Sequence, residues 1–139
     1  MDNETSPRSK FENIHMGLLI LRIGIALLML THGIPKLLLL LSGDEIHFLD
    51  FLGLGASVSL ALAVFAEVVC AILLFLGLAT RWASIPLIVT MLVAIFKAHG
   101  ADPFNIKELA VVYLLIFLTL LVAGGGKYSL QQYLSKFKE

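Results

Sequence analysis

Four long apolar segments dominate the pattern of hydrophobic and polar positions along the chain, at residues 14–41, 57–79, 82–99 and 107–124. They lack the apolar–polar alternation of barrel strands and are far longer than such strands. A helix that crosses a membrane needs about 20 apolar residues. In lipid, every backbone N–H and C=O must be bonded within the protein, which favours helices for these segments. The pattern therefore predicts an all-α integral membrane protein, a four-helix bundle with short loops.

The first segment is interrupted by only a few strongly polar side chains. Arg22 and Lys36 fall near one line on a helical wheel, and His32 lies on the adjoining face about a turn before Lys36. Pro35 removes an N–H from the helix, and Gly33 lies two residues before it, so we expect a kink or an end to the regular helix there. Polar groups are costly in hydrocarbon. We therefore expect this stripe to face protein, water or a ligand.

Composition supports the membrane class and excludes others. Of the 139 residues, 59% are hydrophobic and 14% are charged, whereas soluble domains are about half apolar and a quarter charged. The formal net charge is zero, so nothing electrostatic favours a nucleic-acid partner. Cys70 is the single cysteine, which excludes an intramolecular disulfide. The length suits one domain.

The regions outside the apolar segments complete the predicted organisation. Residues 1–13 form a polar tail that we expect to be mobile, residues 14–126 form the membrane domain, and residues 127–139 form an amphipathic C-terminal tail. The first segment is too long for a signal-peptide core, so it is interpreted as a retained helix. Asn105 is expected to cap the fourth helix, with Glu108 in its first turn. Four spans place both termini on one side, and the Lys and Arg distribution places that side in the cytoplasm.

The candidate ligand-binding residues are the polar side chains within or beside the apolar segments: Arg22, His32, Lys36, Glu67, Lys97 and Glu108. Most of them lie toward the outer end of the predicted bundle, where the acidic and apolar loop 42–56 would cover them. Together they could bind a quinone head group or a small anion, because imidazole carries protons near neutral pH and a cation can hold a carbonyl or oxyanion oxygen. No sequence spacing typical of a metal site is present.

Simpler structural roles exist for the same residues. Lys36 and Lys97 could extend toward the outer headgroups. Glu108 could only cap its helix, and His32 could be a satisfied core histidine. Arg22 and Glu67 could form a structural ion pair, which would offset part of the cost of burial without any ligand.

The chain resembles the DoxX family of small membrane proteins. The resemblance covers about residues 14–130 and rests on LRIGIALLMLTHGIPKL, AVFAEVVCAILLFLGLATRWAS and KELAVVYLLIFLTLLVAGGGKYSL. The family's closing motif often has an acidic residue where this chain has Gln131. The motif positions are Arg22, His32, Gly33, Lys36, Glu67, Gly77, Arg81, Glu108 and Gly124. The resemblance implies a four-helix protein of a bacterial inner membrane, related to a small subunit of thiosulfate:quinone oxidoreductase and to membrane partners of thiol-redox and superoxide-detoxifying proteins.

The functional prediction is a subunit or accessory of a membrane redox system with a site for a quinone head group, bound non-covalently, or for a small anion. His32 and Glu67 would handle protons, and Arg22 and Lys36 would supply positive charge. One alternative is a small transporter or proton-coupled permease, with the same charges lining a path. Another is a membrane scaffold without a ligand. A redox-enzyme partner and a homodimer are the expected protein contacts.

Overall fold

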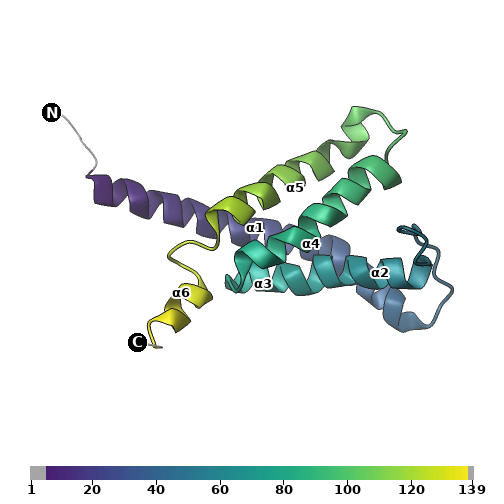
Figure 1. The fold of residues 1–139 in the computed structure, drawn as a ribbon, viewed down its shortest axis with the longest axis horizontal. Helices are drawn as coiled ribbons and strands as arrows, with labels where there is room; N and C mark the ends of the chain where they lie inside the picture. Colours follow the sequence, from purple (N-terminus) through teal and green to yellow (C-terminus); the bar gives the residue numbers. More distant parts are fainter. Residues whose placement is uncertain (1–5, 138–139) are drawn as a thin grey trace.

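The computed structural model describes residues 6–137, which are helical apart from the connecting loops. Figure 1 shows a long first helix whose start lies at the same end of the bundle as the short last helix. The elements are α1 (Pro7–Ser42), α2 (Ala56–Val64), the π-helical η1 (Phe65–Cys70), α3 (Ala71–Leu76), α4 (Thr80–Val93), the π-helical η2 (Ala94–Ala98), α5 (Phe104–Ala123) and α6 (Leu130–Ser135).

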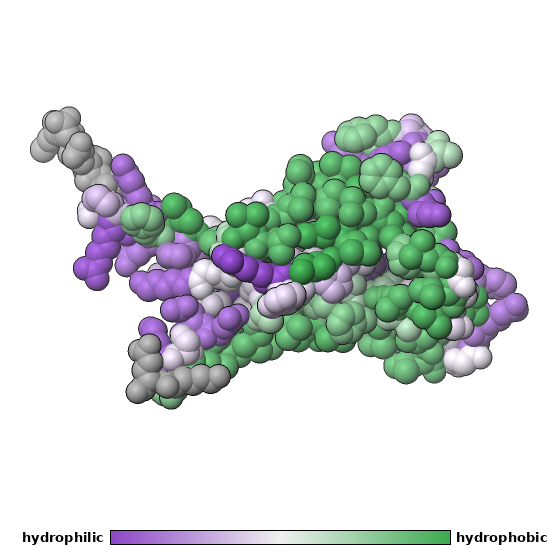
Figure 2. Space-filling view, viewed as in Figure 1, coloured by the Kyte–Doolittle hydropathy of each residue, from purple (hydrophilic) through white to green (hydrophobic). Residues whose placement is uncertain are grey.

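Four stretches are long and apolar enough to cross a membrane: Pro7–Ser42, Ala56–Leu76, Thr80–Ala98 and Phe104–Ala123. They confirm the predicted all-α, four-helix architecture. In Figure 2 hydrophobic residues cover the middle of the molecule, and hydrophilic residues gather at its ends. Many large apolar side chains on this middle belt are exposed, such as Leu115 at 59% and Val122 at 77%. Lipid tails would cover a surface of this kind at no cost.

The first helix is longer than predicted at its start and uninterrupted near its end. It begins at Pro7 rather than at residue 14, with proline in the first turn, where a missing N–H costs nothing. Residues 7–13 are therefore helical, and the rest of the predicted mobile tail, residues 1–5, lies outside the described residues. The helix also continues through Pro35 to Ser42 and ends at Gly43, whose φ is 76°. Of the two outcomes predicted near Pro35, the helix end is wrong, and the kink stays a prediction.

The fourth span also begins differently from the prediction. α5 starts at Phe104 with Pro103 in the cap position and no side-chain cap. The predicted Asn105 cap is therefore wrong, since Asn105 already lies inside the first turn. Pro103 has an extended backbone, with φ −64° and ψ 158°, and this geometry starts the helix without a capping side chain.

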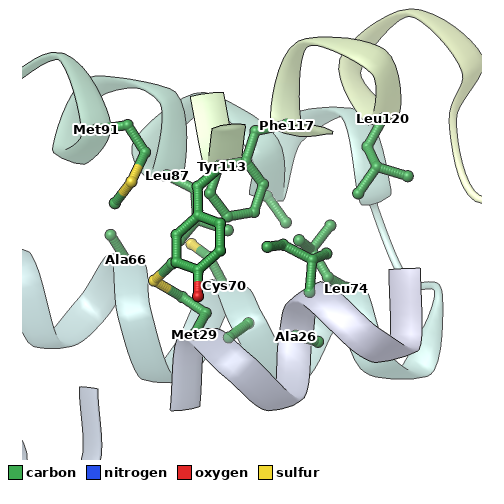
Figure 3. Packing of buried hydrophobic residues seen from close by; sticks show 13 residues of the cluster. Ala26, Met29, Ala66, Cys70, Leu74, Leu87, Met91, Tyr113, Phe117 and Leu120 are labelled. Atoms are coloured by element: carbon green, nitrogen blue, oxygen red, sulfur yellow. The ribbon is translucent and has the colours of Figure 1, made fainter. Parts of the chain in front are cut away.

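The core lies where the four spans meet. Figure 3 shows Tyr113 of α5 pointing toward Met29 of α1, in a cluster that also includes Ala26, Cys70 and Phe117. Its buried apolar members are Ile25, Ala26, Met29, Ala66, Cys70, Ala71, Leu74, Ala83, Leu87, Met91, Tyr113, Phe117 and Leu120. Small residues on the first and second spans let these helices approach closely.

Gly33 of α1 lies at a close approach of two helices. A Cβ atom on Gly33 would lie 2.7 Å from the carbonyl oxygen of Glu67 and 2.8 Å from Cγ2 of Val68. Such distances are too short for a side chain, so only glycine permits this contact between α1 and η1. The contact places the backbone of Glu67 directly against the first helix.

We expect Gly33→Ala to lower the free energy of unfolding by about 1–3 kcal/mol, the usual cost of overpacking a tight contact. Gly24→Ala is the matched control, because nothing lies within 4 Å of the Cβ it would add on the same helix. Unfolding of the purified protein in mixed micelles measures both. Equal stability of the two variants would contradict the tight contact.

Candidate functional site

An ion pair between the first and second spans forms the centre of the candidate site. Nζ of Lys36 lies 2.6 Å from Oε1 and 2.7 Å from Oε2 of Glu67, so the ammonium donates to both carboxylate oxygens. The Glu67 side chain is 3% exposed and that of Lys36 is 31% exposed. Glu67 belongs to η1, and π-helical turns of this kind are uncommon and frequent at functional sites. The acid is thus buried, while its partner keeps one open side.

The open side of this pair faces a cavity of about 640 Å³. Its walls are mainly apolar and come from all four spans and from the loop after α1. Leu62, Phe65, Ile85 and Val89 line the cavity and are each more than 40% exposed on the outside of the bundle. These side chains connect the cavity with the apolar surface of the bundle. A molecule dissolved in the lipid could enter there without crossing water.

Besides the ion pair, the cavity wall carries few polar groups: His32, Ser59, Thr90, His99 and Tyr113. The His99 ring is engaged with Asp102, since its Nδ1 lies 2.8 Å from Oδ2 of that residue. His32, one turn before Lys36, is exposed and lines the cavity. The centroid of its ring lies 6.0 Å from that of Tyr113, and the two rings are arranged edge to face. Ser59 and Thr90 also line the wall, but each hydroxyl donates to a backbone carbonyl of its own helix. The imidazole and the ammonium are thus the groups best placed to meet a ligand.

The loop between α1 and α2 covers one end of the cavity. Phe48, Leu49 and Phe51 line it, and Nζ of Lys36 lies 5.9 Å from the centre of the Phe48 ring. Such a distance is within the range of a cation–π contact. The loop is tied to α2, since the N–H of Phe51 donates to the hydroxyl of Ser59 at 2.8 Å. The loop therefore folds back over the bundle end, as the mixed composition of residues 42–56 predicts.

Arg22 lies at the opposite end of the bundle and takes no part in this site. It precedes Lys36 by 14 residues, about 21 Å along a helix. Its guanidinium donates to the carbonyl oxygens of Gly125 and Tyr128, at 2.8 and 2.9 Å. The alternative of an Arg22–Glu67 ion pair is therefore wrong, as is the role of Arg22 at the outer site. The helical wheel places Arg22 and Lys36 on one face of α1, but the two side chains lie at different ends of that face and have different partners.

Lys97 and Glu108 also lie outside the cavity. Both are exposed, and neither lines its wall. Lys97 is in η2 near the end of the third span, and Glu108 is in the first turns of α5. Of the predicted site residues, the structure thus brings together His32, Lys36 and Glu67. No group of three His, Cys, Asp or Glu side chains near enough to hold a metal ion occurs among residues 6–137.

Tyr113 is the site residue that sequence reasoning did not single out. It is 7% exposed, packs in the core and reaches the cavity wall. A tyrosine in an apolar segment is a weak signal, because its ring packs as well as any other aromatic side chain. Only the placement of α5 opposite α1 brings it to His32.

Comparison with known proteins gives one family and one relative. The model of the DoxX family matches residues 17–100. An uncharacterised protein of Haemophilus influenzae is 34% identical over 120 residues, covering 79% of this chain and 84% of the relative. No solved structure matches. The family match spans the ion pair, the cavity mouth and the loop over it.

We expect Lys36→Met to lower the free energy of unfolding by about 1–3 kcal/mol, because it leaves the Glu67 carboxylate buried without its partner. Glu67→Gln in the same chain should recover part of that loss, since no unpaired charge is then buried. Unfolding of the single and double variants in mixed micelles measures the coupling. Strictly additive losses would show that the two side chains do not interact.

We expect Arg22→Met to release the segment after α5 while the four spans stay folded. The guanidinium is the group that holds the carbonyls of Gly125 and Tyr128 from inside the bundle. Hydrogen exchange over residues 124–137 should rise at least about tenfold, the factor that corresponds to about 1.4 kcal/mol. Unchanged exchange in that segment would mean that other contacts hold it.

Proposed function

The chain belongs to the DoxX family of multi-pass membrane proteins, and we propose that it is a subunit or accessory of a membrane redox system that binds a quinone head group beside Lys36 and Glu67. The observation that carries this proposal is a charged pair at the wall of an apolar cavity that opens on the lipid-facing surface. A small anion is the other ligand of suitable charge.

The energetics of the ion pair favour a binding role. A buried charged pair is seldom more stabilising than apolar residues of similar volume, because both charges lose their hydration. Within a membrane, ionisable residues usually mark sites for substrates, ions or protons. Glu67 is almost completely buried, yet Lys36 keeps an open side toward the cavity. A ligand that accepts a hydrogen bond from the ammonium would use that open side.

The shape of the cavity favours a quinone over a small anion. A volume of about 640 Å³ with mainly apolar walls suits a ring with an apolar tail. A quinone carbonyl could accept from Nζ of Lys36, and the imidazole of His32 could deliver or take a proton. Glu67 would hold the ammonium in place. The quinone would be bound non-covalently.

The setting of this proposal is a bacterial inner membrane with both termini in the cytoplasm. The excess of Lys and Arg near the termini and at the α3–α4 turn supports this orientation. The cavity would then lie in the outer half of the membrane. A redox enzyme is the proposed partner. A homodimer through the small residues of the second span, of which Ser57 and Ala61 are exposed, remains a prediction.

Native mass spectrometry of protein released gently from its own membrane tests the proposal. We expect a stoichiometric quinone mass on the wild type and at least about a tenfold weaker signal for Lys36→Met and for His32→Ala, since each removes a polar contact to the head group. Lys97→Met is the matched control, because it changes an exposed lysine outside the cavity.

Each other result has a defined meaning. A bare protein that folds normally, or one that carries only another polypeptide, would overturn the quinone site and favour the scaffold alternative. Equal losses for Lys36→Met and Lys97→Met would show that the cavity is not where the quinone binds. Solute or proton flux in sealed liposomes would instead favour the transporter alternative.

A further inference from the structure

A second cavity, of about 790 Å³, lies at the opposite end of the bundle from the ion pair. Its walls come from the start of α4, the glycine loop after α5, the start of α6 and one residue of α1. We propose that this cavity binds a phosphate group, carried by an anionic lipid headgroup or by a free phosphate ion. The inference is independent of the quinone site.

The start of α4 supplies one part of this site. Ala79 occupies the cap position in the left-handed region, with φ 46° and no side-chain cap on the helix. Its N–H donates to Oε1 of Gln131 at 3.1 Å. The helical end therefore faces the cavity wall without an acidic or hydroxyl cap. The positive end of a helix attracts phosphate groups, because its first N–H groups point outward.

Cationic side chains supply the second part. Arg81 and Lys127 line the cavity together with the neutral acceptor His15, whose Nδ1 accepts from the N–H of Lys127. An added Cβ on Gly124 would lie 3.3 Å from Nε of Arg81. Arg81 thus lies across the glycine loop. Lys127 forms an ion pair with Glu12, since its Nζ is 3.6 Å from Oε1 of that residue. Among residues 6–137, Arg81 has no such ion pair, so the wall carries an excess of positive charge.

A buried hydroxyl without a partner is the observation that points to a ligand. Thr80 lines the cavity and is 3% exposed, but its hydroxyl has no hydrogen-bond partner among the described residues. An added Cβ on Gly125 would lie 2.8 Å from this hydroxyl and 3.1 Å from Nη1 of Arg22. Gly125 therefore packs closely against both groups, and a side chain at this position would collide with them. Nε of Arg22, just behind, is also buried and unpartnered.

The position of the cavity along the membrane normal fits a headgroup. Trp82, next to Arg81, is 77% exposed. Tryptophan and arginine concentrate at the level of lipid headgroups. The glycine loop and the start of α4 therefore lie at the depth where lipid phosphates are found, and the cations of the wall are within their reach.

The test uses the full-length protein in micelles and native mass spectrometry with phosphatidylglycerol and phosphatidylcholine of the same acyl chains. We expect preferential retention of phosphatidylglycerol. Arg81→Gln should weaken it about fivefold, the effect of one cation near a membrane surface. Arg8→Gln is the matched control, since it removes an arginine at the same end of the bundle but outside the cavity.

Thr80→Val tests the site without changing charge. It removes only the unpartnered hydroxyl, so the lipid-free protein should melt at the same or a higher temperature, while the gain in melting temperature on adding phosphatidylglycerol should shrink. Equal binding of both lipids by the wild type would overturn the lipid as the source of the phosphate, and equal losses for Arg81→Gln and Arg8→Gln would overturn the proposal.

Inorganic phosphate distinguishes the two sources. Saturable stabilisation of the lipid-free protein by phosphate, in competition with phosphatidylglycerol, identifies the free ion as a ligand of the site. Binding of phosphatidylglycerol without any effect of phosphate identifies the lipid. Binding of neither would contradict the site.

Discussion

The ion pair of Lys36 and Glu67 is the constraint that organises the half of this bundle that contains the apolar-walled cavity. A carboxylate that is 3% exposed needs a partner in a place where water is scarce. The partner comes from α1, so α1 and η1 must pack at one register. Gly33 permits that register, since any larger residue would collide with the backbone of Glu67. The same pair places charged groups at the cavity wall. The interaction that stabilises the bundle is therefore also the one proposed to bind the ligand.

The other end of the bundle depends on a second buried cation with a different kind of partner. Arg22 is 1% exposed and is satisfied by backbone carbonyls of the segment after α5 rather than by an acid. A guanidinium suits this role, because its planar fork reaches two acceptors at once. The segment after α5 is thereby held against α1. Gln131 adds to the attachment through the N–H of Ala79, so the position where the family often has an acid serves here as a neutral link.

The fold could be predicted from the sequence to a large extent, and the site only in part. The four spans follow from apolar length alone, because lipid leaves the backbone no alternative to a helix. The predicted helix end at Pro35 failed because contacts with Glu67 hold α1 on both sides of the proline, through Gly33 before it and Lys36 after it. His32, Lys36 and Glu67 were identified because polar residues stand out in apolar segments. Tyr113 was not, since an aromatic ring does not stand out among apolar side chains.

The sequence by itself determined the class of the protein, the number of spans and the residues that must find polar partners. The tertiary structure decided which partners they find. Arg22 and Lys36 lie on one line of the same helix, yet one holds carbonyls and the other an acid. The spacing of residues in the sequence determines only the direction in which each side chain leaves a helix and its position along that helix. Pairing depends on the register between helices, and this register is set by close contacts such as that of Gly33 with Glu67, which join residues far apart in the chain.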